Sequence, residues 1–292
     1  MPRDGAPGSG KDPRFLEAFE ARLQTCVAAF SDSDNTGLME VVSYALSGGK
    51  RVRPLLFASA YALFGERVEE EEALLDWAVA LEMIHAYSLV HDDLPGMDND
   101  RFRRGKLTAH AKYGEAMAIL AGDSLLNMAM ELSSQNLCTL MREDPSAQRD
   151  CLALLFHLSG PQGMIGGQHM DLTMSGQENR AFLDRMVQKK TSALFQAACA
   201  MGVLLAGGSE AQKDTIMIFA EEIGRAYQMK DDLFDRGQDA DSHKISYASQ
   251  WAEKDLEAEI ARLSHQAIER LEAFPHPQRL RTLAEALVHR TY

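Results

Sequence analysis

The segment His91-Asp-Asp-Leu-Pro-Gly-Met-Asp-Asn-Asp100 follows a long apolar stretch, and it determines how the rest of the chain is interpreted. Four of its residues are aspartates within nine positions, and two carboxylates about 4 Å apart repel by roughly 4 kcal/mol at an effective dielectric constant near 20. Pro95 and Gly96 stop the preceding helix, so that Asp98 can fold back towards Asp92 and Asp93. Hard carboxylate oxygens suit Mg²⁺, but a solvated acidic helix end remains an alternative from this segment alone.

The helix that leads into this segment, predicted at about 70–91, carries a stripe of side chains below the acidic end. His85, Ser88 and Asp92 have the spacing i, i+3 and i+7 and therefore share one face. Tyr87 and Ser88 lie five and four residues before Asp92, about 6–7.5 Å deeper along the helix axis. A buried histidine with satisfied hydrogen bonds is the usual explanation for His85; the alternative is that the stripe lines an apolar channel below a metal site.

A second acidic cluster lies on a helix predicted at about 210–236. Gln228, Asp231, Asp232 and Asp235 have the spacing i, i+3, i+4 and i+7, so they share one face. Gly224, one turn earlier on that face, is expected to leave room for a bulky group. One cluster could be a solvated acidic stripe. Two clusters that face each other would have to share cations or raise their pKa values, and around several Mg²⁺ ions they would form a receptacle for a diphosphate.

Cationic segments accompany both acidic clusters. Gly48-Gly49-Lys50-Arg51-Val-Arg53-Pro54 is predicted to form a helix–helix turn, where the glycines allow close backbone approach and the cations suit phosphate. The remaining cations are Arg101, Arg103, Arg104 and Lys106 after the first cluster, Lys189 and Lys190 beside Thr191, and Lys244 after the second cluster. In an acidic protein, this grouping predicts an anion site separate from the metals.

Composition limits the class of protein. The formal net charge of −13 argues against nucleic acid as a partner, because phosphate backbones require a basic face. The four cysteines have no metal-ligand spacing, which favours a reduced, cytoplasmic setting. The longest apolar run is about ten residues, at 197–206, so no membrane span is expected. No signal peptide is recognised at the start of the chain.

The apolar spacing is helical almost throughout and predicts an all-α fold. Phe15, Phe19, Leu23, Cys26 and Phe30 keep the 4-4-3-4 spacing of one helix face. Further helices are predicted at about 38–46, 54–64, 112–141, 146–159, 178–206, 249–273 and 277–290, with a glycine interruption at 160–167 and no convincing strand. Residues 1–13 are rich in Gly and Pro and are expected to be a disordered tail, and residues 14–292 a single all-helical domain.

Taken together, these segments resemble the bacterial farnesyl diphosphate synthase (geranyltranstransferase) group of the trans-polyprenyl diphosphate synthase family. The matching segments occur in the family's order, and they are Gly48–Pro54, Ile84–Asp98, Arg103–Lys106, Ala118–Asp123, Gly163–Gln168, Lys190-Thr191 and Gln228–Asp235, with a similar Ala286–Arg290 near the end. The resemblance implies an isoprenoid-synthase bundle of about ten or more helices around a central cavity.

The resemblance also implies the activity and its residues. An allylic diphosphate (dimethylallyl or geranyl) would ionise to a carbocation and condense with isopentenyl diphosphate, and proton loss would give farnesyl diphosphate. Three Mg²⁺ ions and a homodimer are implied in the same way. The implied metal ligands are Asp92, Asp93, Asp98, Asp231, Asp232 and Asp235. The implied allylic contacts are Arg103, Lys190, Thr191 and Gln228. The implied isopentenyl site is Gly49, Lys50, Arg53, His85 and Arg104. Gln168 and Lys244 are implied as further substrate contacts.

Product length in the family depends on side-chain bulk just before the first acidic motif. Tyr87 with the small Ser88 resembles the C15 pattern, in which an aromatic side chain floors the cavity. One departure concerns the segment after Asp235, where only eight residues precede Lys244 and the family's usual Gly-Lys pair has no counterpart.

Several alternative functions stay open at this point. A geranylgeranyl or other short-chain synthase would share all of these motifs. A non-catalytic partner subunit would account for the short segment after Asp235. A terpene cyclase would not need the Gly49, Lys50, Arg53 and His85 set, and a metal phosphohydrolase would use more histidine ligands than His85 and His91.

Overall fold

The structure is a computed structural model that describes residues 12–65, 67–139, 145–176, 178–236 and 245–289. It divides into two compact units. We call residues 13–55 and 67–152 the N-terminal unit, and residues 1–12, 56–66 and 153–292 the C-terminal unit. The boundaries fall inside α3 (Val52–Tyr61) and α7 (Pro145–Ser159). The single domain at 14–292 therefore stays a prediction, and the expected tail lies almost wholly outside the described residues.

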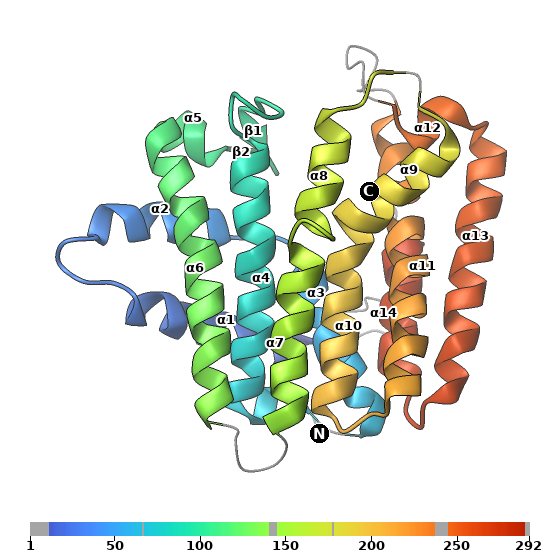
Figure 1. The fold of residues 1–292 in the computed structure, drawn as a ribbon, viewed down its shortest axis with the longest axis horizontal. Coiled ribbons are helices and arrows are strands. Elements are labelled where there is room, and N and C mark those ends of the chain that lie inside the picture. Colours follow the sequence, from blue (N-terminus) through green and yellow to red (C-terminus); the bar gives the residue numbers. More distant parts are fainter. Residues whose placement is uncertain (1–11, 66, 140–144, 177, 237–244, 290–292) are drawn as a thin grey trace. The chain divides into compact units, whose positions relative to one another are not determined.

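The N-terminal unit is built on α4 (Glu72–Asp92), which carries apolar residues around its whole circumference and is mostly buried. Trp77, Leu81 and Ile84 are among its fully buried side chains. Helix α4 packs along α6 (Glu115–Thr139), as Figure 1 shows, and also contacts α1 (Pro13–Ala29) and α2 (Thr36–Leu46). The remaining elements of the unit are η2 (Val68–Glu70), β1 (Phe102–Arg103), β2 (Lys106–Leu107) and α5 (Ala109–Tyr113).

Helix α4 is also the one described helix that is long and apolar enough to cross a membrane. Of its most apolar window, 78% is buried inside the protein. This burial identifies α4 as a core helix.

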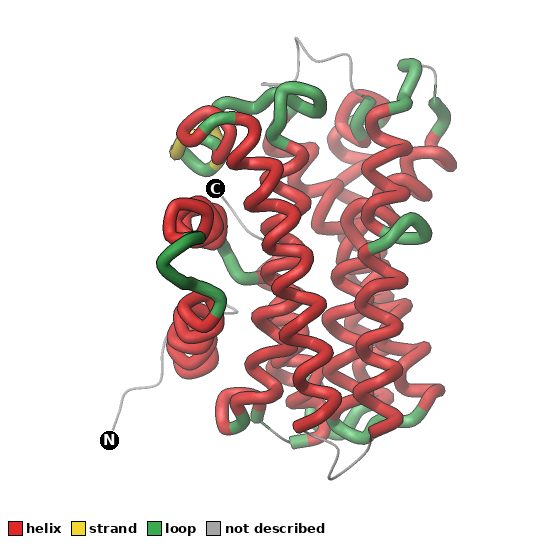
Figure 2. The backbone as a smooth tube through the Cα atoms, turned by 60° about the vertical axis from the view of Figure 1, so that its left-hand side comes forward, coloured by secondary structure: helices red, strands yellow, loops and turns green. Residues whose placement is uncertain are grey.

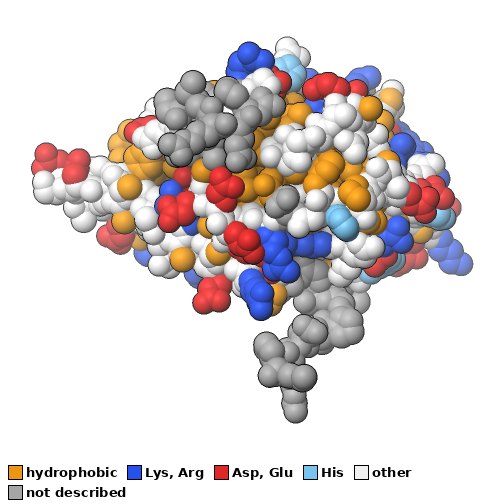
Figure 3. All heavy atoms as spheres, turned by 90° about the horizontal axis from the view of Figure 1, so that it is seen from below, with side chains coloured by type: hydrophobic (Ala, Val, Ile, Leu, Met, Phe, Trp, Pro, Cys, Tyr) orange, Lys and Arg blue, Asp and Glu red, His pale blue; other side chains and the backbone are white. Residues whose placement is uncertain are grey.

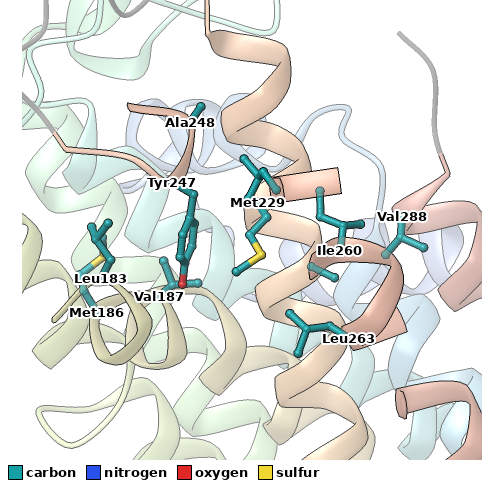
Figure 4. Packing of buried hydrophobic residues seen from close by; sticks show 11 residues of the cluster. Leu183, Met186, Val187, Met229, Tyr247, Ala248, Ile260, Leu263 and Val288 are labelled. Atoms are coloured by element: carbon teal, nitrogen blue, oxygen red, sulfur yellow. The ribbon is translucent and has the colours of Figure 1, made fainter. Parts of the chain in front are cut away.

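The C-terminal unit consists of helices around α11 (Glu210–Asp235). Helix α11 begins with a capping box between Ser209 and Gln212, and it packs against α10 (Ala193–Leu205) and α13 (Glu253–Arg270). One of its apolar clusters joins five helices, as Figure 4 shows: α9 (Arg180–Val187), α11, α12 (Tyr247–Gln250), α13 and α14 (Gln278–Val288), which contribute Leu183, Met229, Tyr247, Leu263 and Val288. The other elements are η1 (Ala62–Phe64), α8 (Met164–Leu172), η3 (Gln188–Ser192) and η5 (Leu271–Ala273).

The prediction of an all-α fold is confirmed. Within the described residues the only strands are β1 and β2, two-residue antiparallel strands that pair Phe102 with Leu107 and Arg103 with Lys106; they are drawn in yellow in Figure 2. On the face drawn in Figure 3, the described acidic and basic side chains are interspersed, and no broad basic surface forms there.

Some predicted element boundaries are wrong. The glycines at 163–167 were expected to interrupt the chain, but α8 begins at Met164 and includes Gly166 and Gly167. The helix expected at 178–206 contains a π-helical turn, η3. Gly114, with a φ of 90°, separates α5 from α6 inside the predicted 112–141 helix. The predicted 249–273 helix is divided into α12, α13 and η5.

Candidate active site

The first acidic segment folds back onto the end of α4. The amide of Asp98 donates to the carbonyl of Asp92 at 2.9 Å, which confirms the expected return of Asp98 towards the helix end. Asn99 turns the chain with a φ of 58°, a conformation that Asn tolerates better than most residues. Asp92 and Asp98 are both partly exposed, so their carboxylates lie where a hydrated ligand can reach them.

Asp93 has a different environment from its neighbours. It is only 4% exposed; its Oδ1 accepts a hydrogen bond from Arg103 Nε at 2.7 Å and forms an ion pair with Arg103 Nη2 at 2.6 Å. Burial raises the pKa of the Asp93 carboxyl, and the hydrogen bond from Arg103 opposes this rise. Arg103 also lies 3.7 Å from Asp100. The β1–β2 hairpin therefore brings a cation directly to the first acidic motif.

The cationic turn before α3 meets the same hairpin. Gly49 has a φ of 105°, and a Cβ atom added there would collide with the Arg104 guanidinium. Among the described residues, three non-glycine side chains have positive φ values: Arg51, Asn99 and Arg104. All three are in the turns that carry the predicted site. Such backbone strain costs of order 1–3 kcal/mol each and is found preferentially at functional sites.

Arg51 points into the protein although it lies between two predicted phosphate contacts. It is 5% exposed, and it donates to Glu82 Oε1 at 2.8 Å, to Glu20 Oε1 at 2.7 Å and to the carbonyl of Leu46 at 2.8 Å. These three contacts fix the turn against α1 and α4. The turn can then present Lys50 and Arg53 while Arg51 holds it in place.

His85 lies where the cations of the N-terminal unit converge. Burial lowers the pKa of His85 well below 6.5, and the charges of Arg53, Arg104, Arg103 and Arg51 lower it further. The charges of Arg53, Arg103 and Arg104 thus all act on His85, whereas the resemblance implied Arg53 and Arg104 for the isopentenyl site and Arg103 for the allylic site. A neutral imidazole among four guanidinium groups is the arrangement expected of a site for a polyvalent anion.

Tyr87 occupies the interior of the N-terminal unit. Its side chain is 6% exposed, and its hydroxyl has no hydrogen-bond partner among the described residues. Burial raises the pKa of Tyr87 to about 12. Its ring meets the ring of His91 edge-on, with the centroids 6.0 Å apart. The Ser88 hydroxyl donates to the carbonyl of His85 at 2.8 Å, so the wall at this level consists of the Tyr87 ring and a small side chain.

The second acidic motif belongs to a hydrogen-bonded chain in the C-terminal unit. Thr191 Oγ1 donates to Gln228 Oε1 at 3.0 Å, and Gln228 Nε2 donates to Asp232 Oδ1 at 2.9 Å. The amide of Tyr247 donates to Asp232 Oδ2 at 2.8 Å. Three of the predicted site residues, Thr191, Gln228 and Asp232, are therefore joined directly. Asp231 and Asp235 are partly buried on the same helix, α11.

The π-helix η3 carries Lys190 and Thr191 and is packed tightly between two glycines. A Cβ on Gly167 would lie 2.6 Å from Lys190 Cα, and a Cβ on Gly224 would lie 2.9 Å from Ser192 Cα. The expectation that Gly224 leaves room for a bulky group is therefore wrong, because the backbone of η3 fills that space. π-Helical turns are rare and occur frequently at functional sites.

Lys190 has a partner that the sequence analysis did not single out. Its Nζ lies 2.5 Å from Oδ2 of Asp171, whose side chain is 8% exposed. Asp171 is one turn after Gln168 on α8, so the i, i+3 spacing was the available signal. Lys244, another predicted contact, and most of the short 236–243 segment lie outside the described residues.

The family model described as "Polyprenyl synthetase" matches residues 35–254 of this chain. The chain belongs to the polyprenyl synthetase family. The farnesyl diphosphate synthase of Geobacillus stearothermophilus is 40% identical over 226 residues, covering 76% of this chain and 74% of that protein. The geranylgeranyl diphosphate synthase of Cyanophora paradoxa is 39% identical over 231 residues, covering 74% of this chain and 75% of that protein.

Solved structures agree with this polyprenyl synthetase assignment. A geranyltransferase from Legionella pneumophila has a TM-score of 0.83 at 32% identity, and the match covers 94% of both chains. An FPP/GFPP synthase from Zymomonas mobilis has a TM-score of 0.81 at 34% identity, with 94% of this chain and 98% of that chain covered. The protein is thus a prenyltransferase with the isoprenoid synthase fold, and the phosphohydrolase and cyclase alternatives are left without support.

Members of the polyprenyl synthetase family generally depend on Mg²⁺, and the donors in this chain fit that ion. Within the described residues, no group of three or more His, Cys, Asp or Glu side chains is gathered closely enough to hold a metal ion. Mg²⁺ does not need such a cage, because it is commonly bound through one or two carboxylates together with substrate phosphates. Asp92 and Asp98 are brought to the same helix end by a backbone hydrogen bond, and Asp232 adds a carboxylate in the second acidic motif.

Proposed function

We propose that this prenyltransferase condenses isopentenyl diphosphate with an allylic diphosphate, dimethylallyl or geranyl, and ends at farnesyl diphosphate. In each cycle the bond between C1 of the allylic chain and its diphosphate oxygen breaks and leaves an allylic cation. The isopentenyl double bond then attacks C1, and the product cation loses a proton from the former isopentenyl C2. The released diphosphate accepts that proton, so no protein side chain is required as the base.

The observation that supports this function best is the cationic site around His85. In an acidic protein with a net charge of −13, the charges of four arginines act on His85; Arg51 and Arg103 are paired with carboxylates, and Arg53 and Arg104 belong to the site assigned below. We assign Gly49, Lys50, Arg53, His85 and Arg104 to the diphosphate of isopentenyl diphosphate. Because His85 is neutral at pH 7, it can accept or donate a hydrogen bond there without adding further positive charge.

We assign the allylic diphosphate to the two acidic motifs with their neighbouring polar groups. Asp92, Asp93, Asp98, Asp231, Asp232 and Asp235 would hold up to three Mg²⁺ ions, and Arg103, Lys190, Thr191, Gln228, Gln168 and Lys244 would complete the contacts. When bound, Mg²⁺ stabilises the charge that develops on the departing diphosphate. The carboxamide of Gln168 and the hydroxyl of Thr191 would orient their dipoles towards the cation.

Product length rests on Tyr87. Relatives named for farnesyl and for geranylgeranyl products are almost equally similar to this chain, so their names do not decide between the two. The Tyr87 hydroxyl has no hydrogen-bond partner among the described residues, so the side chain contributes volume rather than a polar contact. A bulky ring about 7.5 Å along the helix from Asp92 supports a floor suited to a C15 chain.

Replacing Tyr87 tests this floor. Tyr87→Ala removes the ring and is expected to shift the product from C15 to C20 or longer. Tyr87→Phe keeps the ring and removes only the unpartnered hydroxyl, so it should keep the C15 product and cost no stability. Leu89→Ala, on the same helix, controls for general loosening of α4. Products are sized by reversed-phase chromatography after phosphatase treatment, and a C15 product from Tyr87→Ala would contradict the assignment.

The whole proposal is tested by incubating the protein with geranyl diphosphate, isopentenyl diphosphate and Mg²⁺ and measuring released diphosphate. Release in step with isopentenyl incorporation supports the synthase. A C20 product from the unaltered chain would favour a geranylgeranyl synthase, and no release alone or with a partner chain would favour a non-catalytic subunit. We also propose a homodimer, for which sedimentation velocity should give about twice the 32.3 kDa chain mass. A cytoplasmic location stays a prediction.

A further inference from the structure

Both carboxylate oxygens of Asp232 are held by protein donors. Gln228 Nε2 donates a hydrogen bond to Oδ1 at 2.9 Å, and the backbone amide of Tyr247 donates one to Oδ2 at 2.8 Å. Gln228 is one turn earlier on the same helix, whereas Tyr247 lies on α12, beyond the next segment of the chain. The orientation of this carboxylate therefore depends on where Tyr247 is placed.

Tyr247 is itself anchored at its other end. Its side chain is 1% exposed, and its hydroxyl donates to Asp184 Oδ1 at 2.8 Å. Figure 4 shows the ring beside Leu183 and Val187 of α9, within the apolar cluster. One residue thus connects the second acidic motif, through its backbone, to a carboxylate on α9, through its side chain.

Asp184 is fixed in turn by two guanidinium groups. Arg225 Nη2 donates to Asp184 Oδ1 at 2.9 Å, and Arg180 Nε lies 3.6 Å from Asp184 Oδ2. Arg180 also stacks on Trp251, 4.0 Å from the ring centroid. Burial raises the pKa of the Tyr247 hydroxyl, and the charge of Asp184 raises it further, so this hydroxyl remains a donor at every physiological pH.

The local sequence explains why Tyr247 can serve in this way. Ser246 caps α12 reciprocally with Ser249, and this cap fixes the backbone at Tyr247. The amide of Tyr247 belongs to the first turn of α12, where backbone N–H groups have no partner within the helix, and here that donor is directed at Asp232. The backbone contact and the side-chain contact of Tyr247 are therefore made from one rigid position.

We infer that Tyr247 and Asp184 are positioning residues for prenyl transfer, which act through Asp232 to hold the second acidic motif in its diphosphate-binding orientation. The inference rests on the proposed function, because it assumes that this motif binds a Mg²⁺–diphosphate. Tyr247 is buried, and neither residue is assigned a substrate contact. Groups that orient a metal-binding carboxylate typically change metal affinity or activity about 10- to 100-fold when they are removed.

The test measures binding without turnover. Isothermal titration calorimetry with inorganic pyrophosphate in the presence of Mg²⁺ gives a Kd for the unaltered chain and for Tyr247→Phe, which removes only the hydroxyl. The Kd is expected to rise about tenfold, the lower limit for such groups. In steady-state assays the KM for geranyl diphosphate should rise by a similar factor, while the KM for isopentenyl diphosphate should change less than about twofold.

Tyr113→Phe is the matched control. The Tyr113 hydroxyl also donates to a carboxylate, Glu40 Oε1, at 3.1 Å, but it does so in the N-terminal unit, away from Asp232 in the chain. This variant should bind Mg²⁺–pyrophosphate as the unaltered chain does. A loss of affinity equal to that of Tyr247→Phe would reduce the effect to general destabilisation and overturn the inference.

A double-mutant cycle tests the route through Asp232. In an Asp232→Asn background, Tyr247→Phe should change the Kd less than about twofold, because the group on which it acts is altered already. If Asp232→Asn binds Mg²⁺–pyrophosphate too weakly to titrate, the cycle is made with Asp184→Asn and Tyr247→Phe instead. The double variant should then lose no more affinity than the weaker-binding single variant. Fully additive losses, or an unchanged Kd in Tyr247→Phe, would overturn the inference. An unaltered chain that neither binds Mg²⁺–pyrophosphate nor releases diphosphate would overturn the proposed function as well.

Discussion

Replacing Arg51 with methionine should destabilise the protein strongly, although the residue lies in a cationic turn. Its side chain joins three acceptors, and the decisive one is Glu82. The side chains of Arg51 and Glu82 are each only 5% exposed, and the second oxygen of Glu82 has no hydrogen-bond partner among the described residues. Arg51→Met therefore leaves a carboxylate buried without its cation.

The magnitude follows from these contacts. Removing one partner of a buried ion pair typically costs about 3–5 kcal/mol, because the remaining charge is uncompensated. The contact with Glu20, which is 45% exposed, should add less than about 1 kcal/mol. At about 2 °C per kcal/mol, the midpoint of thermal unfolding should fall by about 6–10 °C. Methionine keeps the side-chain length and inherits the same positive φ, so backbone strain is unchanged in the comparison.

Thermal unfolding followed by circular dichroism and calorimetry checks this prediction, with Glu82→Leu combined with Arg51→Met as the second variant. The double variant should recover most of the lost stability, because well-packed apolar residues often replace a buried ion pair without loss. The reasoning would be refuted if Arg51→Met lowered the midpoint by less than about 2 °C, or if the double variant were less stable than the single one. Refolded activity at a permissive temperature shows whether the turn still presents Lys50 and Arg53.

Two further predictions concern pH and packing. Because the pKa of folded His85 is lowered below its unfolded value of 6.5, the unfolded chain binds a proton there that the folded chain does not, so stability is lost as pH falls below 6.5. His85→Gln should reduce this loss by up to about 1.4 kcal/mol per pH unit, measured by urea unfolding at pH 5.0–7.5. If the free energy of unfolding depended on pH as it does in the unaltered chain, the lowered pKa of His85 would be contradicted. Gly224→Ala should cost about 1–3 kcal/mol and impair turnover, because the new Cβ would lie 2.9 Å from Ser192 Cα. The matched Gly37→Ala, which has nothing within 4 Å, should be neutral or stabilising, and equal destabilisation by both changes would show that packing against η3 is unimportant.

The features that depend on local spacing were predictable from the sequence. The return of Asp98 to Asp92 follows from Pro95-Gly96, and it is present as a backbone hydrogen bond. The i, i+4 spacing of Gln228 and Asp232 predicted a shared face, and the two side chains are hydrogen-bonded. Such interactions are determined within one or two turns of chain, so periodicity and turn chemistry are sufficient to find them.

The features that depend on distant partners were not predictable. Nothing in Lys50-Arg51-Val-Arg53 distinguishes the inward Arg51 from its neighbours, because its partner Glu82 is more than thirty residues away on α4. The pairing of Lys190 with Asp171 is concealed in the same way, between η3 and α8. Glycine was misinterpreted for a related reason: Gly167 and Gly224 are small because another backbone approaches them, and a single sequence does not show that approach.

The extra residue in the turn at Gln188–Ser192 separates the rotational phases of α9 and α10. In a regular α-helix each residue advances about 100° around the axis. The direction of the α9 face that carries Asp184 would therefore fix the direction of the buried face of α10. The wider turn shifts that relation by one residue. A single-residue deletion there should therefore let the turn close to regular α-geometry with both helices in phase, whereas a single-residue deletion inside α9 or α10 should rotate one helix against the other by about 100°. The irregular turn therefore allows α9 and α10, which follow each other without a break, to present faces in different directions.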